Sequence, residues 1–476
     1  MSKFHSTLTR RDFMKGLGLA GAGLGAAAAT TPVFHDMDEV ISSPKSNWER
    51  NWWVKERDIP TVEIDWNMLE RFDSTKIMQV NHAHYVGVEQ HNAEIVQGMS
   101  KKRECIQNKT LGFTQRDYAL KDAALFGWVQ GFSHGFIQDE FADQAGTSSS
   151  TTGSTNSGLD SLPKWDGTPE ENAKMIRLAG RVLGCSTVGY VELDENTIKL
   201  VNSFDWDSKK IEFEDVEQAY ETDTKRVIPL KCKNVIIFSL QHSGEALKRA
   251  PAALCDVATG MRYSLSLLSQ IRLQRFIRSL GYQSLGTYRF VNNMSLLPPM
   301  AIMAGLGEQS VAGQTLTPEY GGLAGLAAVF TDLTIAPTKP IDAGMWEFCQ
   351  TCHKCGRLCP SGAIKESDSA SWEVKGPWNN PGKFATTMSG PECQSFWNVT
   401  STICGICNSV CPFSKEHNAS VHEFVMSTVA ETSLFNRYFT KLDDLFGYGV
   451  MPESEYENWW ELNANQVPTW GINSTR

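Results

Sequence analysis

The middle of the chain alternates between hydrophobic patterns with helical spacing and short apolar runs. Residues 168–171 read Thr-Pro-Glu-Glu, a capping box with proline at the first helical position, and they predict a helix that extends to about residue 183. Residues 188–193 and 235–240 are rich in β-branched and aromatic side chains and contain few charges. We expect these two runs to be strands of a central sheet.

A longer helix is predicted over residues 251–280. Leucine and isoleucine recur near helical spacing between residues 265 and 280, and Gly281 follows as a stop signal. Residues 295–340 are rich in glycine and proline, so we expect a loop-dominated, weakly polar segment there. Such a segment fits either an ordinary buried loop or the lining of a flat apolar cofactor.

The chain of 476 residues is long enough for two or three domains. Residues 146–158 form a Ser/Thr/Gly-rich linker or exposed loop, and the region before them predicts short helices and loops. Helices and strands together indicate an α+β fold. The net charge of −10 argues against a nucleic-acid partner, which usually requires a basic surface. We expect five segments, at residues 1–29, 30–158, 159–340, 341–425 and 426–476.

The N-terminus carries an export pattern. Arg10 and Arg11 precede Phe13 and Lys15, and an apolar Gly/Ala-rich run follows over residues 16–29. This order is typical of a twin-arginine signal, and the run is too short for an ordinary membrane-spanning helix. Because this route carries folded proteins, we expect a cofactor-loaded protein that is exported to the outer face of the cytoplasmic membrane and is peripheral there.

Eight of the twelve cysteines lie in two runs. The first run reads C-x2-C-x2-C-x3-C and the second reads C-x10-C-x2-C-x3-C, and proline follows each. The first spacing is the bacterial ferredoxin pattern, in which three thiolates bind one 4Fe–4S cluster and the fourth binds the other cluster. We therefore predict two 4Fe–4S clusters, bound by a first quartet of Cys349, Cys352, Cys355 and Cys411 and a second quartet of Cys359, Cys393, Cys404 and Cys407.

Zinc and disulfides are the competing interpretations of these cysteines. Structural zinc typically uses two C-x2-C pairs, which two interlocked runs with trailing prolines fit poorly. Exported cysteines often form disulfides, but thiolates that already hold iron are not free to do so. The remaining cysteines are isolated, and we expect them to be small buried side chains: Cys105, Cys185, Cys232 and Cys255.

Together these features resemble the respiratory reductive dehalogenases. The resemblance also rests on NWWVKERDIPTVEIDW at residues 51–66 and PPMAIMAGLGEQSVAGQTLTPEYG at residues 298–321, and it extends through most of the chain. It implies a corrinoid in a nitroreductase-like core over residues 159–340, with a ferredoxin-like domain over residues 341–425 that passes electrons to cobalt. Reduced cobalt would attack an organohalide at halogen or carbon, and hydrogen would replace the halogen.

The resemblance also implies partners and the state of the cofactor. The expected partners are an organohalide substrate, a small membrane anchor subunit and an upstream electron donor of the respiratory chain. The corrinoid is expected to be base-off, bound without a lower protein ligand. The D-x-H-x-x-G motif that supplies such a ligand does not occur in the sequence, which is consistent with that state.

Two catalytic residues follow from the resemblance. In the family the proton donor is a tyrosine on the helix that ends at a Leu-Gly-Tyr-Gln segment, and counting back from residues 280–283 places it at Tyr263. A phenol, with a pKa of about 10, can act as an acid when a nearby cation stabilises the phenolate. The family asparagine corresponds best to Asn292, with Asn293 as its neighbour. The structural alternatives are a core tyrosine and a turn asparagine.

The sequence departs from the family where a cation is expected. Some members carry an arginine just after the Thr-Pro-Glu-Tyr-Gly segment, where Gly325 stands here, and another after Gly-Glu, where Val311 stands. Arg289 and Arg262 are the two candidates to replace that cation. We expect a pocket that is less polar or differently arranged than in members with the arginine.

Two other functions fit part of the sequence. An exported iron–sulfur electron carrier without corrinoid would need far fewer than the roughly 300 residues that precede the cysteine runs. An enzyme similar to epoxyqueuosine reductase would also hold a corrinoid and two clusters. The export signal and the absence of a basic composition for transfer RNA argue against it.

Overall fold

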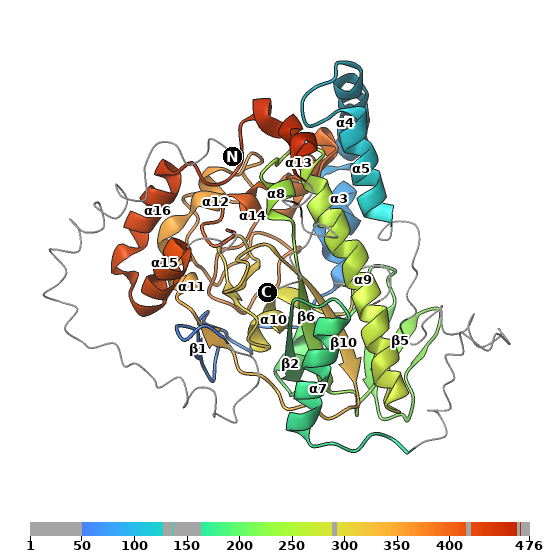
Figure 1. Cartoon of the computed structure of the whole chain (residues 1–476). Coiled ribbons are helices and arrows are strands. Elements are labelled where there is room, and N and C mark those ends of the chain that lie inside the picture. The colour runs from blue at the N-terminus through green and yellow to red at the C-terminus, as the bar shows by residue number, and fades with distance from the viewer. Residues whose placement is uncertain are drawn as a thin grey trace, which may run out of the picture.

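The computed structural model describes residues 50–126, 136, 163–287, 293–415, 420–463 and 467. Its central element is an antiparallel sheet in the order β2-β6-β10-β7 (Figure 1). All eight residues of β6 are buried, so the sheet is covered on both faces. The two predicted strands are confirmed within one residue. The strands are β2 (Thr187–Glu192), β6 (Asn234–Gln241), β7 (Ser284–Leu285) and β10 (Ala324–Thr331).

Helices cover the two faces of this sheet. Successive side chains of a strand point to opposite faces. A Cβ on Gly180 of α7 would lie 2.9 Å from Val188, whereas a Cβ on the next strand residue, Gly189, would lie 2.4 Å from the carbonyl oxygen of Ala304, directly after α10. Two helices therefore lie on one face, α7 (Pro169–Val182) and α9 (Cys255–Ser279), and the opposite face carries α10 (Leu297–Met303).

The predicted helices are confirmed with one shift of boundary. The capping box of α7 is formed, because Thr168 Oγ1 accepts from the Glu171 N–H and the Glu171 carboxylate accepts from the Thr168 N–H. Helix α9 begins four residues later than residue 251, because the preceding residues form tight turns in which the Cys255 N–H donates to the Ala252 carbonyl.

Most of residues 295–340 lie outside helices and strands, as predicted, but the prediction missed two longer elements there. This stretch contains α10 and the central strand β10, whose sequence is AGLAAVFT. Alanine and glycine are weak strand formers. However, all eight residues of β10 pair with β6 and seven of them are buried, so packing on both faces outweighs the weak local preference.

The N-terminal part of the described chain packs beside the sheet. Its helix α4 has 20 residues, so the expectation of short helices there is wrong. Helix α5 packs along α9, and β1 pairs with β11 near the cysteine runs. The bounds are β1 (Lys55–Glu56), η2 (Ser74–Lys76), α3 (Met78–Val86), α4 (Val88–Gln107), α5 (Gln115–Phe126) and β11 (Ile341–Asp342).

A second sheet of three strands flanks the first. In it β3 (Lys210–Glu214) runs parallel to β5 (Lys225–Pro229), and β4 (Tyr220–Glu221) pairs antiparallel with β5. The remaining short elements of the central region are η5 (Thr197–Leu200), α8 (Gly244–Leu247), β8 (Glu308–Gln309) and β9 (Thr315–Leu316).

The C-terminal part carries the cysteine runs on short helices. A separate hydrophobic core there joins Cys349 and Cys352 to Phe348, Met426 and Phe439. Within the described ranges, no helix has both the length and the apolar character needed to cross a membrane. The elements are α11 (Met345–Cys352), α12 (Lys354–Arg357), α13 (Gly390–Thr400), α14 (Ile406–Ser409), α15 (Ser420–Glu431), η6 (Ser433–Phe435), α16 (Asn436–Leu445) and η7 (Glu453–Glu461).

Candidate functional site

The four thiols of the first quartet line one cavity, which Cys407 of the second quartet also lines. Helix α11 contributes two of them, α12 contributes one, and Cys411 follows α14. Val311, Leu316, Phe348 and Phe413 complete much of the wall, so the space is largely apolar. Four sulfur ligands around a dry cavity are the environment that a 4Fe–4S cluster requires.

A left-handed residue shapes each cysteine turn. His353 lies between the second and third thiols of the first run, with φ 46° and ψ 17°, and Gly405 holds the corresponding place in the second run, with φ 80° and ψ 3°. Each is the N-cap of the short helix that carries the next cysteine. This conformation reverses the chain sharply, so thiols three residues apart can face the same space.

The second quartet is also brought together. Burial raises the pKa of the Cys393 thiol, and Cys407, Cys404 and Cys359 raise it further. Burial likewise raises the pKa of Cys349, and Cys411, Cys352 and Cys355 add to that rise. Cys393 and Cys349 thus each lie near the other three members of their own predicted quartet. Cys355 lies near Cys407 as well, and hydrogen bonds lower the pKa of Cys359 despite its burial.

Neither competing interpretation of the cysteines gains support. All twelve cysteines are within the described residues, and none forms a disulfide. The described part of the chain also contains no group of three His, Cys, Asp or Glu residues close enough to hold a single metal ion. The assignment of individual ligands stays a prediction.

Of the isolated cysteines, three are buried as predicted and Cys105 is half-buried. One of them, Cys255, has a specific contact, because its thiol donates to the carbonyl of Cys404 at 2.8 Å. Cys404 belongs to the second quartet, so the first residue of α9 touches the segment that carries it. The sequence offered no signal for this contact.

A buried carboxyl group anchors the helix that carries Cys349. Glu308 is 1% exposed, and one of its oxygens accepts from the backbone N–H groups of Ala343 and Met345 at 2.8 and 3.0 Å. Its other oxygen accepts from the Thr61 hydroxyl at 2.8 Å. These contacts fix the N-terminus of α11 to the central core. The sequence analysis missed Glu308.

Tyr263 lies on α9, half-buried against the central core, with a guanidinium group on its ring. The Cζ atom of Arg262 is 3.4 Å from the ring centroid, and Arg262 Nε donates to His242 Nε2 at 3.0 Å. His242 is buried at the end of β6, and burial together with Arg262 holds the pKa of His242 well below its usual value. A neutral imidazole is therefore the acceptor that fixes the guanidinium.

Gly325 provides the space for this arrangement. A Cβ at Gly325 would lie 1.9 Å from Arg262 Cδ, so the side chain of Arg262 occupies the volume that a residue at position 325 would need. Of the two cations considered from the sequence, Arg262 therefore lies against Gly325, the position at which the resemblance implies an arginine in some members. Arg289 lies outside the described residues.

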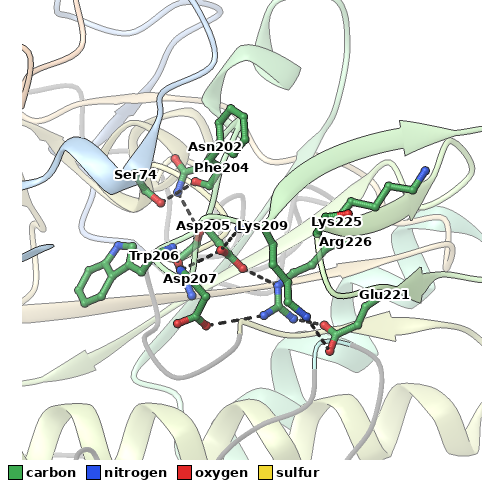
Figure 2. A network of polar contacts seen from close by, with 12 residues as sticks. Ser74, Asn202, Phe204, Asp205, Trp206, Asp207, Lys209, Glu221, Lys225 and Arg226 are labelled. Carbon is green, nitrogen blue, oxygen red and sulfur yellow. Dashed lines mark hydrogen bonds and ion pairs between the residues drawn. The ribbon is translucent and has the colours of Figure 1, made fainter.

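Asn292 also lies outside the described residues, but its neighbour has a clear structural role. The Asn293 side-chain oxygen accepts from the Trp206 N–H at 2.7 Å, and its carbonyl accepts from the Asn202 amide at 3.0 Å. Asp205 anchors the chain at Trp206, because its carboxylate pairs with buried Arg226 at 2.6 Å (Figure 2). Asn293 thus connects the segment that begins after residue 292 to the chain at Asn202 and Trp206.

Known proteins resemble this chain over most of its length. A family model described as reductive dehalogenase subunit matches residues 49–335, which excludes both cysteine runs. A chloroethene reductive dehalogenase of Dehalococcoides mccartyi strain VS is 32% identical over 97% of this chain and 98% of its own length. A trichloroethene reductive dehalogenase of another strain of that species is 29% identical over 96% of this chain and 97% of its own length.

A solved structure shares the fold. A reductive dehalogenase whose description refers to B12-dependent dehalogenation is 17% identical, with a TM-score of 0.52. The match covers 82% of this chain and 48% of that chain, so this chain corresponds to about half of the solved one. The mixed helix and strand fold is therefore that of reductive dehalogenases. Sequence and fold together show that this chain belongs to the reductive dehalogenase family, oxidoreductases that act on carbon–halogen bonds.

Proposed function

We propose that this chain is the catalytic subunit of a corrinoid-dependent reductive dehalogenase that replaces halogen by hydrogen on a small organohalide. The observation that carries the proposal is the convergence of the first-quartet thiols on one cavity, in a chain of this family. The names of the two relatives favour chlorinated ethenes among the possible substrates. Chlorinated alkanes and arenes are the other classes to be tested.

In this proposal the central sheet with its helices is a nitroreductase-like core that holds the corrinoid base-off. When bound, the corrinoid supplies a low-valent cobalt centre for cleavage of the carbon–halogen bond. Among the buried polar atoms without a hydrogen-bond partner in the described part of the chain, one lies beside Arg262 and is proposed to face this group. Nδ1 of His242 is buried and has no hydrogen-bond partner among the described residues, while Nε2 accepts from Arg262 and so leaves the proton on Nδ1.

Tyr263 is the proposed proton donor, and Arg262 the cation that lies over its ring. Loss of the phenol proton leaves a negative charge on the Tyr263 oxygen. The guanidinium held over the ring stabilises that charge, in a site partly shielded from water. Arg262 thereby takes the part of the arginine that other members carry at the position of Gly325. Asn292 stays a proposed partner of this pair.

The two quartets would hold 4Fe–4S clusters within a ferredoxin-like domain and deliver electrons to the core. Contacts at the start of α9 support delivery through the second quartet. The Ile403 N–H donates to Asp256 at 2.8 Å, and Tyr263 lies seven residues further along the same helix, which is a distance of roughly 10 Å. A helix thus connects the second quartet to the proposed site of proton transfer.

Export and assembly are further parts of the proposal. The twin-arginine pattern over residues 9–15 supports export to the outer face of the cytoplasmic membrane. There the protein would be peripheral, bound to a small membrane anchor subunit and supplied by an upstream electron donor. Residues 1–29 lie outside the described residues, so this part rests on the sequence alone.

Reconstitution tests the proposal. The protein, loaded anaerobically with iron, sulfide and a corrinoid, is expected to release halide from chlorinated ethenes in the presence of a low-potential donor. Cobalt and iron analysis of the same sample separates the alternatives. An exported electron carrier would bind iron without cobalt, and dehalogenation by cobalt-free protein would overturn the proposal. An enzyme similar to epoxyqueuosine reductase would bind cobalt and release no halide from any of the three substrate classes.

A further inference from the structure

A buried ion pair lies at the start of α9, beside the second quartet. Asp256 is fully buried, and its Oδ2 is 2.6 Å from Lys121 Nζ, which comes from α5. The Lys121 side chain is 11% exposed. Burial raises the pKa of Asp256, and Lys121 opposes that rise. Of this pair, only the contact of Asp256 with Ile403 entered the proposed function, and Lys121 has no part in it.

Both members of the pair bind the segment that carries Cys404. Lys121 Nζ donates to the Ser401 carbonyl at 2.8 Å, and Asp256 Oδ1 accepts from the Ile403 N–H at 2.8 Å. Together with the bond from Cys255 to the Cys404 carbonyl, three polar contacts hold three of the four residues 401–404.

The segment needs such support. Ser401 and Cys404 have φ values of 55° and 65°, a left-handed conformation that is unfavourable for residues other than glycine. Such a conformation persists only where the surrounding structure imposes it. The ion pair and its neighbours therefore place the Cys404 thiol.

Stability alone gives little reason for burying two charges here. A buried ion pair often contributes no more than well-packed apolar side chains of the same volume, because both charges lose their hydration. Charges buried beside an iron–sulfur cluster have a different effect. A nearby negative charge favours the oxidised cluster and a nearby positive charge favours the reduced one, and burial weakens the screening of both.

We propose that Lys121 and Asp256 are positioning residues that hold the Cys404 segment and set the reduction potential of the cluster bound by the second quartet. The inference rests on the proposed function only in requiring a cluster at that quartet. It assigns this ion pair a role in controlling electron transfer toward the core.

The test is a redox titration of purified holoenzyme, followed by electron paramagnetic resonance. Asp256→Asn keeps the oxygen that accepts from the Ile403 N–H and removes the negative charge, so the potential of the second cluster is expected to become more positive. Lys121→Met removes the positive charge and is expected to make the same potential more negative. Iron content is measured in each variant to show that both clusters are present.

A matched lysine variant near the first quartet shows which paramagnetic resonance signal belongs to which cluster. Lys354 lies between two cysteines of the first quartet and pairs with Asp443 at 2.5 Å. Lys354→Met is therefore expected to shift the other cluster signal. The inference is supported if the potential of the second cluster alone shifts, and shifts in opposite directions in the Asp256 and Lys121 variants. Loosened packing would not shift the potential in opposite directions in the two variants.

Several outcomes would overturn it. One is an Asp256→Asn protein with both clusters and an unshifted second potential, and another is a shift of the same sign in both variants. If Asp256→Asn fails to retain its clusters, Lys121→Met carries the test, and an unshifted second potential there counts against the inference. Wild-type protein that holds no iron–sulfur clusters would instead refute the proposed function.

Discussion

Replacing Glu308 by glutamine is expected to change the pH dependence of stability in a defined way. Burial raises the pKa of Glu308 from 4.5 to about 7, against the opposing effect of the Ala343 N–H, the Thr61 hydroxyl and the Met345 N–H. The folded state therefore holds this proton more tightly than the unfolded state. The resulting stabilisation is complete below the unfolded pKa and is lost as the pH rises through about 7.

The size of the effect follows from these two pKa values. Between about pH 5.5 and about pH 7.5, the contribution of Glu308 to the free energy of unfolding falls by about 1.8 kcal/mol. Glutamine does not titrate in this range. Its oxygen can accept from the Ala343 and Met345 N–H groups, and its amide can donate to Thr61. Glu308→Gln should therefore lose the pH dependence while keeping the contacts that anchor α11.

Thermal unfolding under anaerobic conditions, followed by circular dichroism across that pH range, measures the difference. Glu308→Gln is expected to gain stability relative to the wild type as the pH rises. Glu308→Ala, the matched control, should show the same flattened dependence but be less stable throughout, by about 1–3 kcal/mol for each N–H group left unsatisfied. A Glu308→Gln protein that keeps the wild-type pH dependence would refute the reasoning.

Three further predictions concern the site. Arg262→Met should lower kcat for halide release by about 10- to 100-fold at unchanged iron and cobalt content, because the phenolate of Tyr263 loses its cation. An unchanged kcat would exclude Arg262 from the mechanism. Gly325→Ala should displace Arg262 and so lower kcat as well. It should also lower the free energy of unfolding by about 1–3 kcal/mol, measured by thermal unfolding. A wild-type kcat would show that Arg262 does not need the space at Gly325. Cys393→Ala should remove about half of the bound iron and leave the signal of the first cluster, and retention of all iron would contradict the assignment of Cys393.

The cysteine runs illustrate what local sequence can predict. Ligand spacing is a property of a few consecutive residues, and the left-handed turns at His353 and Gly405 follow from the same short motif. The capping box of α7 and the two apolar strands are local in the same sense, and the structure contains all of them. Strand β10 was missed because its strand character comes from its neighbours, not from its own alanines and glycines.

By itself, the sequence determined the family, the predicted cluster ligands and two of the four strands of the central sheet. Only the tertiary structure decided which groups surround the reacting residues. It placed Arg262 in the space left by Gly325, buried Glu308 under α11 and paired Lys121 with Asp256 beside Cys404. The physical reason is that each arrangement joins segments far apart in the chain. Burial, charge pairing and available volume act only once those segments are packed together.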